Sequence, residues 1–264
     1  MIELYHNNMS VCSQKARLAL AEKRLKATEH HLNLRAGDQQ RPEYTRLNPN
    51  AYVPTLVHDG APIIESAVIC EYLEEAFPDP PLLPASAAGR AAARLWTRRA
   101  DAGVFEACGT ISNAIAFRFQ WLARPADELA NILRTIPDRN RRARRQQLLE
   151  LGTDAPIFIN AVWTYDKLLS DMERALAGKA WLLGDAYTLA DLSITPYINR
   201  LAQLELSGMW SPSRPNVAAW LDRIRQRENY RAAITPYDDP KYLALMSEQG
   251  HGQWPKVEEI LTRS

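Results

Sequence analysis

Apolar and polar residues alternate at the start of the chain, where Ile2-Glu3-Leu4-Tyr5 has the two-residue period of a half-buried strand. From Val11 the period changes to that of a helix, whose apolar positions continue to Ala21. The segment from Leu25 to Leu34 then predicts a second strand. A helix between two strands favours parallel pairing of those strands within one sheet.

A hairpin and a third helix are predicted next. Short apolar runs at residues 55–57 and 63–64 flank Asp59-Gly60, which is a strong signal for a two-residue turn. An apolar stripe with helical spacing follows Glu65-Ser66, and Ser66 is a candidate N-cap for that helix. The order strand-helix-strand and then strand-strand-helix, in fewer than 80 residues, predicts a thioredoxin-like α/β domain over residues 1–80.

The rest of the chain has the pattern of an all-helical domain, which we assign to residues 88–264. Before it, four of the eight residues in the segment 77–84 are proline, which is typical of a linker. No later segment predicts a strand. Helical patterns cover residues 91–119, 156–177, 188–201 and 215–226, and the third pattern opens with Thr188 and Asp191 at the spacing of a capping box.

Composition and charge argue against several classes of protein, namely nucleic-acid-binding, membrane, disulfide-rich and zinc proteins. The chain of 264 residues has a net charge of +1, so no global field attracts nucleic acid or a membrane surface. No apolar run is long enough to span a bilayer, and the first residues lack the features of a signal peptide. Three widely spaced cysteines predict neither a disulfide framework nor a zinc site. We therefore expect a cytoplasmic protein without a metal, a nucleic-acid partner or a membrane partner.

Residues 53–66 also have the chemistry of a peptide-binding surface. A cis bond before Pro54 would turn the N–H and C=O of Val53 outward, where they can pair with an extended ligand. The first turn of the next helix offers N–H groups that suit a carboxylate, and Glu65 can accept from an ammonium group. The same residues also fit an ordinary hairpin, turn proline and helix cap, so the local pattern leaves both interpretations open.

Three motifs, taken in order, resemble the cytosolic glutathione transferase family. They are Asn48-Pro49 followed by Tyr52-Val53-Pro54-Thr55-Leu56, then Glu65-Ser66, and then the Thr188/Asp191 capping box after an aromatic-Leu-Leu-Gly turn. The resemblance implies glutathione as co-substrate, a cis proline at Pro54, and binding of the γ-glutamyl group by Glu65 and Ser66. It also implies a contact to the glycyl carboxylate, for which Gln39 and Tyr52 are the candidates. Tyr52 departs from the family, because many relatives have Lys or Gln at this position.

A thioredoxin-like domain keeps its reactive residue in the loop between the first strand and the first helix. The task there would be to hold the glutathione sulfur as a thiolate, by lowering a thiol pKa of about 8.5 to ~7 or below. Ser10 ranks first, because it matches the first serine of the zeta-class Ser-Ser-Cys run. Cys12 ranks second, since it matches the cysteine of beta-class transferases, and Ser13 ranks third, because it matches a serine of the bacterial β-etherases. The alternatives are a plain N-cap at Ser10, a small buried residue at Cys12 and an exposed first-turn residue at Ser13.

Two further features bear on the reaction. Residues 64–96 are similar to the β-etherase branch, in which the arginine-rich segment also has a counterpart, whereas the loop around Cys12 is less similar. The arginine cluster is either a solvated helix face or a site for an acidic ligand. Its members are Arg139, Arg141, Arg142, Arg144 and Arg145.

We therefore predict a homodimeric glutathione transferase of the detoxification type. It would bind glutathione on the α/β domain, stabilise the thiolate and transfer it to a small hydrophobic electrophile. Two alternatives stay open among enzymes, namely glutathione-dependent β-aryl ether cleavage and reductive chemistry on disulfides or peroxides. A third alternative is a glutathione-transferase-like binding protein without turnover.

Overall fold

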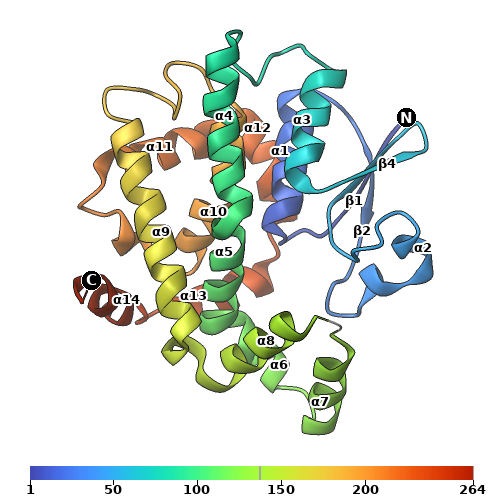
Figure 1. The fold of residues 1–264 in the computed structure, drawn as a ribbon, viewed down its shortest axis with the longest axis vertical. Coiled ribbons are helices and arrows are strands. Elements are labelled where there is room, and N and C mark those ends of the chain that lie inside the picture. Colours follow the sequence, from blue (N-terminus) through green and yellow to red (C-terminus); the bar gives the residue numbers. More distant parts are fainter. Residues whose placement is uncertain (137, 264) are drawn as a thin grey trace. The chain divides into compact units, whose positions relative to one another are not determined.

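A mixed β-sheet is the centre of the N-terminal part of the protein (Figure 1). The computed structural model describes residues 1–136 and 138–263, and in these ranges the strands are β1 (Ile2–His6), β2 (Thr28–His31), β3 (Thr55–His58) and β4 (Ala61–Ile64). They form one sheet in the order β2-β1-β3-β4, in which β1 is parallel to β2 and antiparallel to β3. The predicted parallel pair and the predicted hairpin are confirmed.

The hairpin turn and the buried face of the sheet follow from the local sequence. Asp59 and Gly60, which join β3 to β4, have φ angles of 49° and 83°. Two successive positive φ angles are what a type I′ turn requires, and this turn matches the twist of the strands. Leu4 and Leu56 are paired across β1 and β3 and are fully buried. Burial of each leucine stabilises the fold by roughly 1.5–3 kcal/mol.

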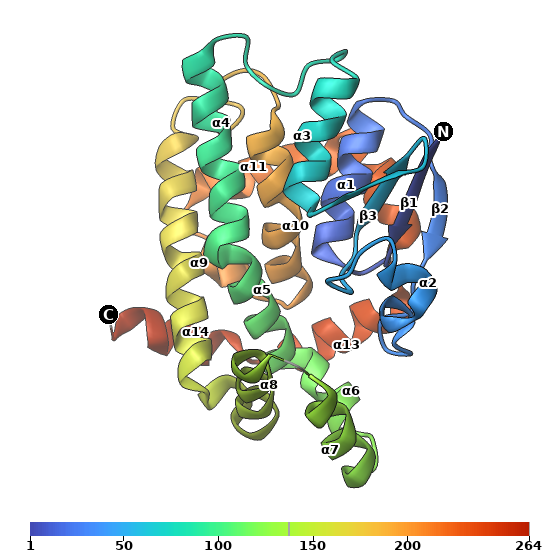
Figure 2. The ribbon, with the colours of Figure 1, turned by 45° about the vertical axis from the view of Figure 1, so that its right-hand side comes forward.

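Helices cover both faces of this sheet. Helix α1 (Val11–Glu22) packs against α3 (Ser66–Ala76) on one face, and the short α2 (Pro42–Thr45) lies on the other side (Figure 1 and Figure 2). The 3-10 turn η1 (Asp38–Gln40) precedes α2. The prediction that Ser66 caps α3 is wrong, because Ser66 is already helical and Glu65 occupies the cap position with a φ of 68°.

The first compact unit consists of Met1–Arg98, Gly178–Pro196 and Ala219–Asp239. Besides the sheet and its helices, it contains the whole of α12 (Glu228–Ile234) and the 3-10 turn η6 (Thr235–Tyr237). It also contains parts of three longer helices: α4 (Ala87–Arg99) as far as Arg98, the first half of α10 (Leu189–Gln203) and most of α11 (Pro215–Gln226). Helix α12 packs along α1. Arg227, just before α12, bonds both carboxylate oxygens of Glu22 at 2.8 and 2.7 Å and so ties the end of α1.

The predicted capping box of α10 is confirmed, and Asp191 is its buried centre. The Asp191 carboxylate accepts from the N–H groups of Thr188 at 3.1 Å and Leu182 at 2.9 Å, and from Trp220 Nε1 at 2.9 Å. Thr188 Oγ1 in turn accepts from the N–H of Ala190 at 3.3 Å. Burial raises the pKa of Asp191, and the surrounding donors oppose that shift.

The second compact unit consists of Arg99–Ala177, Tyr197–Ala218 and Pro240–Ser264. The prediction of one continuous helix over residues 91–119 is wrong. Helix α4 ends at Arg99, and α5 (Phe105–Ser112) lies between two wide π-helical turns, η2 (Ala100–Val104) and η3 (Asn113–Phe117). The chain leaves the helical conformation at Ala102 and at Gly103, whose φ of 130° is accessible to glycine but unfavourable for other residues.

The remaining helices also belong to the second unit. They are α6 (Arg118–Leu122), α7 (Ala126–Thr135), α8 (Arg139–Leu151), α9 (Pro156–Ala175), α13 (Pro240–Gly250) and α14 (Trp254–Thr262), with 3-10 turns at η4 (Gly152–Asp154) and η5 (Ser207–Met209). Helix α9 packs along α5, and α14 also contacts α9. The arginine cluster lies on α8, where Arg144 pairs with Glu106 at 2.9 Å and Arg145 lies over the ring of Trp121. The sequence pattern did not predict α13 and α14.

The described residues contain neither a candidate membrane span nor a candidate metal cluster. None of the helices in the described ranges combines the length and the apolar character needed to cross a lipid bilayer. In the same ranges, no group of three or more His, Cys, Asp or Glu side chains is arranged to hold a metal ion. Beyond β4, the described part of the chain forms no strand apart from an isolated bridge between Trp181 and Gly184, as the sequence predicts.

Candidate active site

Three predicted site segments meet at one end of the sheet. Tyr5 of β1 is paired with Thr55 of β3, and Thr55 is paired with Ile64 of β4. Neighbouring strands are about 4.8 Å apart. The loop after β1, the residues Val53–Pro54 before β3 and Glu65 after β4 therefore lie side by side. The sheet register thus brings the candidate catalytic loop next to the candidate binding residues.

Asn7 holds the loop after β1 in one conformation. Its backbone N–H donates to Ser13 Oγ at 3.2 Å, and its side-chain amide donates to the carbonyl of Leu32 at 2.9 Å. Its Oδ1 accepts from the N–H of Met9 at 3.1 Å, and its carbonyl accepts from the N–H of Ser10 at 3.2 Å. The backbone on both sides of Ser10 is therefore fixed before any ligand binds.

Ser10 caps α1 and keeps a hydroxyl proton for a ligand. Its Oγ accepts from the N–H of Ser13 at 3.3 Å. A serine hydroxyl that accepts one bond can still donate its own O–H. This donor lies at the N-terminus of a helix of 12 residues, where the partial positive charge also favours an anion. Ser10 is thus suited to stabilise a negatively charged sulfur.

Ser13 and Cys12 have different surroundings. Ser13 is 0% exposed and its Oγ accepts from Asn7, so the alternative of an exposed first-turn residue is wrong. Cys12 is half-buried in the first turn of α1 and forms no disulfide within the described residues. Ser10 and Cys12 are therefore both candidates for contact with a bound sulfur, and their predicted order stays a prediction.

The segment before β3 is anchored by polar contacts around Thr55. The Tyr44 hydroxyl bonds Thr55 Oγ1 at 2.8 Å and also donates to the carbonyl of Tyr52. Asn48 Nδ2 donates to the same carbonyl at 2.9 Å. The Val53–Pro54 bond is cis, as the family resemblance implies. The anchored backbone leaves the Tyr52 side chain 45% exposed at the surface.

Glu65 combines an exposed carboxylate with an unusual backbone conformation. Its φ of 68° is rare for a residue with a side chain, and such residues cluster at ligand sites. In the part of the chain that the structure describes, no side chain caps α3, whose first residue is the buried Ser66. The N–H groups of the first turn of α3 are therefore available for a carboxylate next to an acceptor for an ammonium group.

Gln39 lies in η1, in the loop that follows β2. This loop starts at the same end of the sheet, because His31 at the end of β2 is paired with His6 at the end of β1. Within the described residues, the buried Oε1 of Gln39 has no hydrogen-bond partner. An unpaired buried acceptor is costly. Since the amide can rotate to present its two N–H donors instead, Gln39 fits the predicted contact to a carboxylate.

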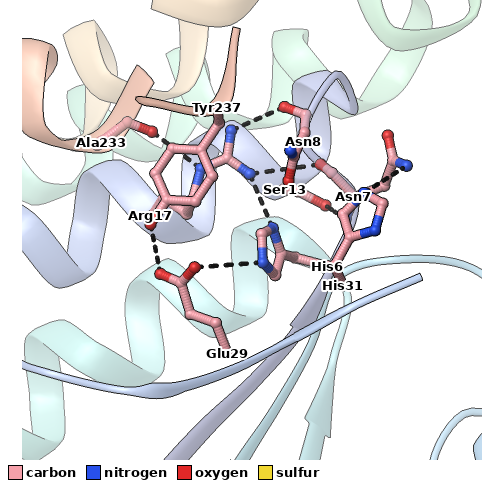
Figure 3. A network of polar contacts seen from close by, with 9 residues as sticks. All are labelled: His6, Asn7, Asn8, Ser13, Arg17, Glu29, His31, Ala233 and Tyr237. Carbon is pink, nitrogen blue, oxygen red and sulfur yellow. Dashed lines mark hydrogen bonds and ion pairs between the residues drawn. The ribbon is translucent and has the colours of Figure 1, made fainter. Parts of the chain in front are cut away.

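A polar network around the buried side chains of Arg17 and His6, beside the loop, was not singled out from the sequence (Figure 3). It joins Arg17 and His6 to Glu29 and Tyr237. Burial lowers the pKa of Arg17 to about 10 and that of His6 to about 4. Burial and the bond to Glu29 raise the pKa of Tyr237 to about 12. At neutral pH, Arg17 is therefore a cation and His6 is neutral.

A signal for Arg17 does exist in the sequence. It stands between the apolar residues Ala16 and Leu18 in a helix with a narrow polar face. A charged residue in that position predicts a specific partner, because charged side chains are rarely fully buried unless paired. The local pattern does not identify the partner, which lies more than 200 residues further along the chain.

Family models match both parts of the chain. The model described as the N-terminal domain of glutathione S-transferase matches residues 9–76, and the model described as its C-terminal domain matches residues 161–223. The chain belongs to the glutathione S-transferase family. The N-terminal match of this transferase includes Ser10, Pro54, Glu65 and Ser66.

Named relatives share most of their length with this glutathione S-transferase. The Arabidopsis thaliana glutathione S-transferase TCHQD is 27% identical over 250 residues, which are 89% of this chain and 90% of the relative. Protein LigF from Sphingobium sp. is 28% identical over 236 residues, which are 86% of this chain and 90% of the relative.

Solved structures share the fold. The crystal structure of the beta-etherase LigF aligns with a TM-score of 0.80 at 24% identity, covering 89% of this chain and 99% of that chain. A glutathione transferase from Burkholderia graminis, solved with two glutathione molecules per subunit, has a TM-score of 0.66 at 24% identity and covers 91% of this chain and 88% of that chain. The fold of this transferase is therefore shared with an ether-cleaving enzyme and with a glutathione-bound one.

Proposed function

We propose that this enzyme binds glutathione on its N-terminal α/β unit, ionises the glutathione sulfur and transfers it to a small hydrophobic electrophile. The observation that carries the proposal is the placement of Ser10. Its hydroxyl has a proton to donate and lies at the N-terminus of α1, at the same end of the sheet as Pro54 and Glu65. The neighbour from Burkholderia graminis that was solved with glutathione supports the choice of co-substrate.

Each part of glutathione has a matching group on this surface. The α-carboxylate of the γ-glutamyl residue would bind Ser66 and the uncapped N–H groups of α3, and its ammonium group would bind Glu65. The cysteinyl backbone would pair with Val53, next to the cis Pro54. The glycyl carboxylate would contact Gln39 and Tyr52. The sulfur would then lie near the loop that contains Ser10, Cys12 and Ser13.

The first role of the site is to stabilise the thiolate. A hydrogen bond to a charged group contributes about 1.5–3 kcal/mol. One pKa unit corresponds to about 1.4 kcal/mol, so a single bond from Ser10 would lower the thiol pKa by roughly one to two units. A thiol with a usual pKa of about 8.5 would then be roughly a quarter to three quarters ionised at pH 7, instead of about 3%. The thiolate attacks an electrophilic carbon, which forms the C–S bond and expels the leaving group.

Cleavage of β-aryl ethers is the second candidate function, and the likeness to LigF favours it. LigF is 28% identical by sequence, and its solved structure is described as a beta-etherase. In this reaction the same thiolate would displace a phenolate from the carbon that bears the ether oxygen. Reductive chemistry would instead use the Cys12 thiolate, which could attack a disulfide between glutathione and another thiol. This attack would release that thiol and leave glutathione bound to Cys12 as a mixed disulfide, and a second glutathione would then displace Cys12 and leave as glutathione disulfide. A non-catalytic binding protein would hold glutathione without turnover.

The proposal also covers the oligomeric state of the protein, its location in the cell and the roles of its two domains. We propose a homodimer that works in detoxification in the cytoplasm, where glutathione is abundant and thiols such as those of Cys12, Cys70 and Cys108 stay reduced. Residues 1–80 would form the glutathione-binding domain and residues 88–264 the helical substrate domain. Of the two interpretations of the arginine cluster on α8, the functional one is that it binds an acidic group of the electrophile.

Product analysis distinguishes the candidate reactions. The purified protein is incubated with glutathione and an aryl halide, a β-aryl ether or a disulfide. Transfer yields a conjugate with glutathione on carbon, ether cleavage also releases a phenol, and reductive chemistry yields glutathione disulfide. Saturable binding of glutathione without any of these products would leave only the non-catalytic alternative.

Substitution of Ser10 tests the assignment of the thiolate donor. Ser10→Ala is expected to lower kcat roughly tenfold to a hundredfold, the equivalent of one charge-assisted hydrogen bond, with a much smaller change in the Kd for glutathione. Ser10→Gly is the control for loss of the helix cap, because glycine at an N-cap costs only about a few tenths of a kcal/mol. Turnover that survives in both Ser10 variants but is abolished by Cys12→Ala would assign the reaction to the cysteine.

A further inference from the structure

Arg17 is a buried cation that points from α1 toward the loop with the candidate catalytic serine. Its side chain is only 3% exposed. Nη2 donates to the carbonyl of Asn8 at 2.9 Å, and Nη1 donates to the carbonyl of Asn7 at 3.3 Å and to His6 Nδ1 at 3.0 Å (Figure 3). One guanidinium therefore binds three consecutive residues at the end of β1 and in the loop that follows.

The carbonyl of Asn7 links Arg17 to Ser10 directly. This oxygen accepts from Arg17 Nη1 at 3.3 Å and from the backbone N–H of Ser10 at 3.2 Å. A carbonyl oxygen has two lone pairs and can serve both donors. The position of the Ser10 backbone, and with it the direction of the Ser10 hydroxyl, therefore depends on where Arg17 holds the Asn7 carbonyl.

Arg17 is itself held from the C-terminal part of the same compact unit. Nε donates to the carbonyl of Ala233 at 2.8 Å, and the ring of Tyr237 lies 4.1 Å from the guanidinium carbon. The Tyr237 hydroxyl donates to Glu29, which also pairs with His6 Nε2 at 3.4 Å. These contacts surround the guanidinium in Figure 3. A planar guanidinium with donors in fixed directions is suited to such an anchored position.

We propose that Arg17 is the positioning residue of the active site: it fixes the Asn7–Asn8 carbonyls and thereby holds the Ser10 hydroxyl in the place where it meets the glutathione sulfur. The inference rests on the proposed function and assigns to that site a residue that does not touch the substrate. Charged and titratable groups that face Arg17 are His6, Glu29, Tyr237 and Asp238.

Two variants of Arg17 change the contacts to different degrees. Arg17→Met keeps much of the side-chain volume but removes every donor of the guanidinium, so that the carbonyls of Asn7 and Asn8 lose their bonds to Arg17 while the bond from the Ser10 N–H to the Asn7 carbonyl can persist. Arg17→Lys keeps the charge, but a single ammonium group cannot reach Asn7, Asn8 and Ala233 with the fork geometry of a guanidinium. The lysine variant is the milder change and keeps the test possible if the methionine variant does not fold.

The matched control is Arg227→Met. Arg227 binds both oxygens of Glu22 at the opposite end of the same helix, so its removal also destabilises α1 but leaves the loop before Ser10 untouched. All variants are compared with the unaltered protein at a temperature where circular dichroism shows them folded. The measurements are kcat, KM for glutathione, and the apparent pKa of the bound glutathione thiol from the pH dependence of thiolate absorbance.

Both Arg17 variants are expected to raise the pKa of the bound thiol and to lower kcat roughly tenfold to a hundredfold, as displacement of a catalytic group by about 1 Å does. KM should change much less, because the groups that hold the peptide part of glutathione stay in place. Arg227→Met should lower thermal stability without moving the thiol pKa. This split would support a positioning role, since mere loss of stability would not move the pKa.

Two results would contradict the inference, and they are distinguishable. If the unaltered protein ionises bound glutathione and folded Arg17 variants have the same thiol pKa and kcat as Arg227→Met, the inference alone is wrong. If the unaltered protein neither binds glutathione nor ionises its thiol, the proposed function is wrong, and the inference fails with it.

Discussion

His6 is neutral at pH 7 because its surroundings make the protonated form unfavourable. The side chain is 2% exposed, and its Nδ1 accepts from Arg17 at 3.0 Å. A proton on Nδ1 would remove this acceptor and place a second cation next to the guanidinium. Burial and Arg17 together lower the pKa of His6 from 6.5 to about 4. His6 therefore binds a proton more weakly in the folded state than in the unfolded chain.

The lowered pKa predicts a loss of stability in mild acid. Stability from neutral His6 is present above about pH 6.5 and is lost as the pH falls toward 4, because only the unfolded state gains the proton in that window. Between pH 7 and pH 5 the loss should be about 2 kcal/mol. Urea unfolding of the unaltered protein and of His6→Gln at both pH values checks it, with the exposed His251→Gln as control for loss of an imidazole. Equal pH dependence in all three proteins would contradict the assignment.

Residues that act through a local motif could be read from the sequence, and residues that act at long range could not. Pro54, Glu65 and Ser10 stand in short motifs whose geometry follows from a turn, a strand end and a helix start. From the sequence, Arg17 could be recognised only as a polar residue of the first helix. Its contacts could not be predicted, because its partners Ala233 and Tyr237 come from the other end of the chain. The cap of α3 was misplaced by one residue, since the positive φ of Glu65 is set by tertiary context.

Among the elements, α10 depends on one buried carboxylate. Asp191 Oδ1 accepts from Leu182 and Trp220, and Oδ2 accepts from Thr188. These donors come from the turn before α10 and from α11, so Asp191 connects three segments that are separate in the sequence. An unpaired buried donor costs about 1–3 kcal/mol.

Loss of this carboxylate is predicted to destabilise the protein strongly. Asp191→Ala removes the acceptor of four buried donors, namely the N–H groups of Leu182 and Thr188, the Thr188 hydroxyl and Trp220 Nε1, so the free energy of unfolding should fall by at least about 3 kcal/mol. The matched control is Asp185→Ala, an exposed acidic residue in the preceding turn, for which a change within about 0.5 kcal/mol is expected. Chemical denaturation measures both. A small change for Asp191→Ala would mean that the donors find other acceptors.

Periodicity predicted where helices occur better than where they are interrupted. The segment 91–119 has an unbroken helical pattern, yet Gly103 and the π-helical turn η3 divide it. The pattern does not show this division, because a π-helical turn is a single wide turn inserted between α-helical segments that each keep their own apolar period. Helices α13 and α14 were missed for the opposite reason, since prolines and glycines near their ends suggested an irregular tail.

At the scale of the whole molecule, sequence motifs, the topology of the sheet and the matches to family models all indicate the same family. The motifs around Pro54 and Asp191, the sheet order and the two family matches lead to the same conclusion. Fold alone does not determine the reaction. The proposal of thiolate chemistry rests on Ser10 and the groups around it, while the choice of electrophile depends on the product analysis.

The most direct test of the account is a calorimetric titration of the purified protein with glutathione. The arrangement of Ser10, Val53, Glu65 and the start of α3 predicts saturable binding with one Kd in the micromolar to millimolar range. Glu65→Ala should weaken that binding about tenfold or more, because it removes the acceptor for the γ-glutamyl ammonium group. No detectable binding at millimolar glutathione would contradict the central claim.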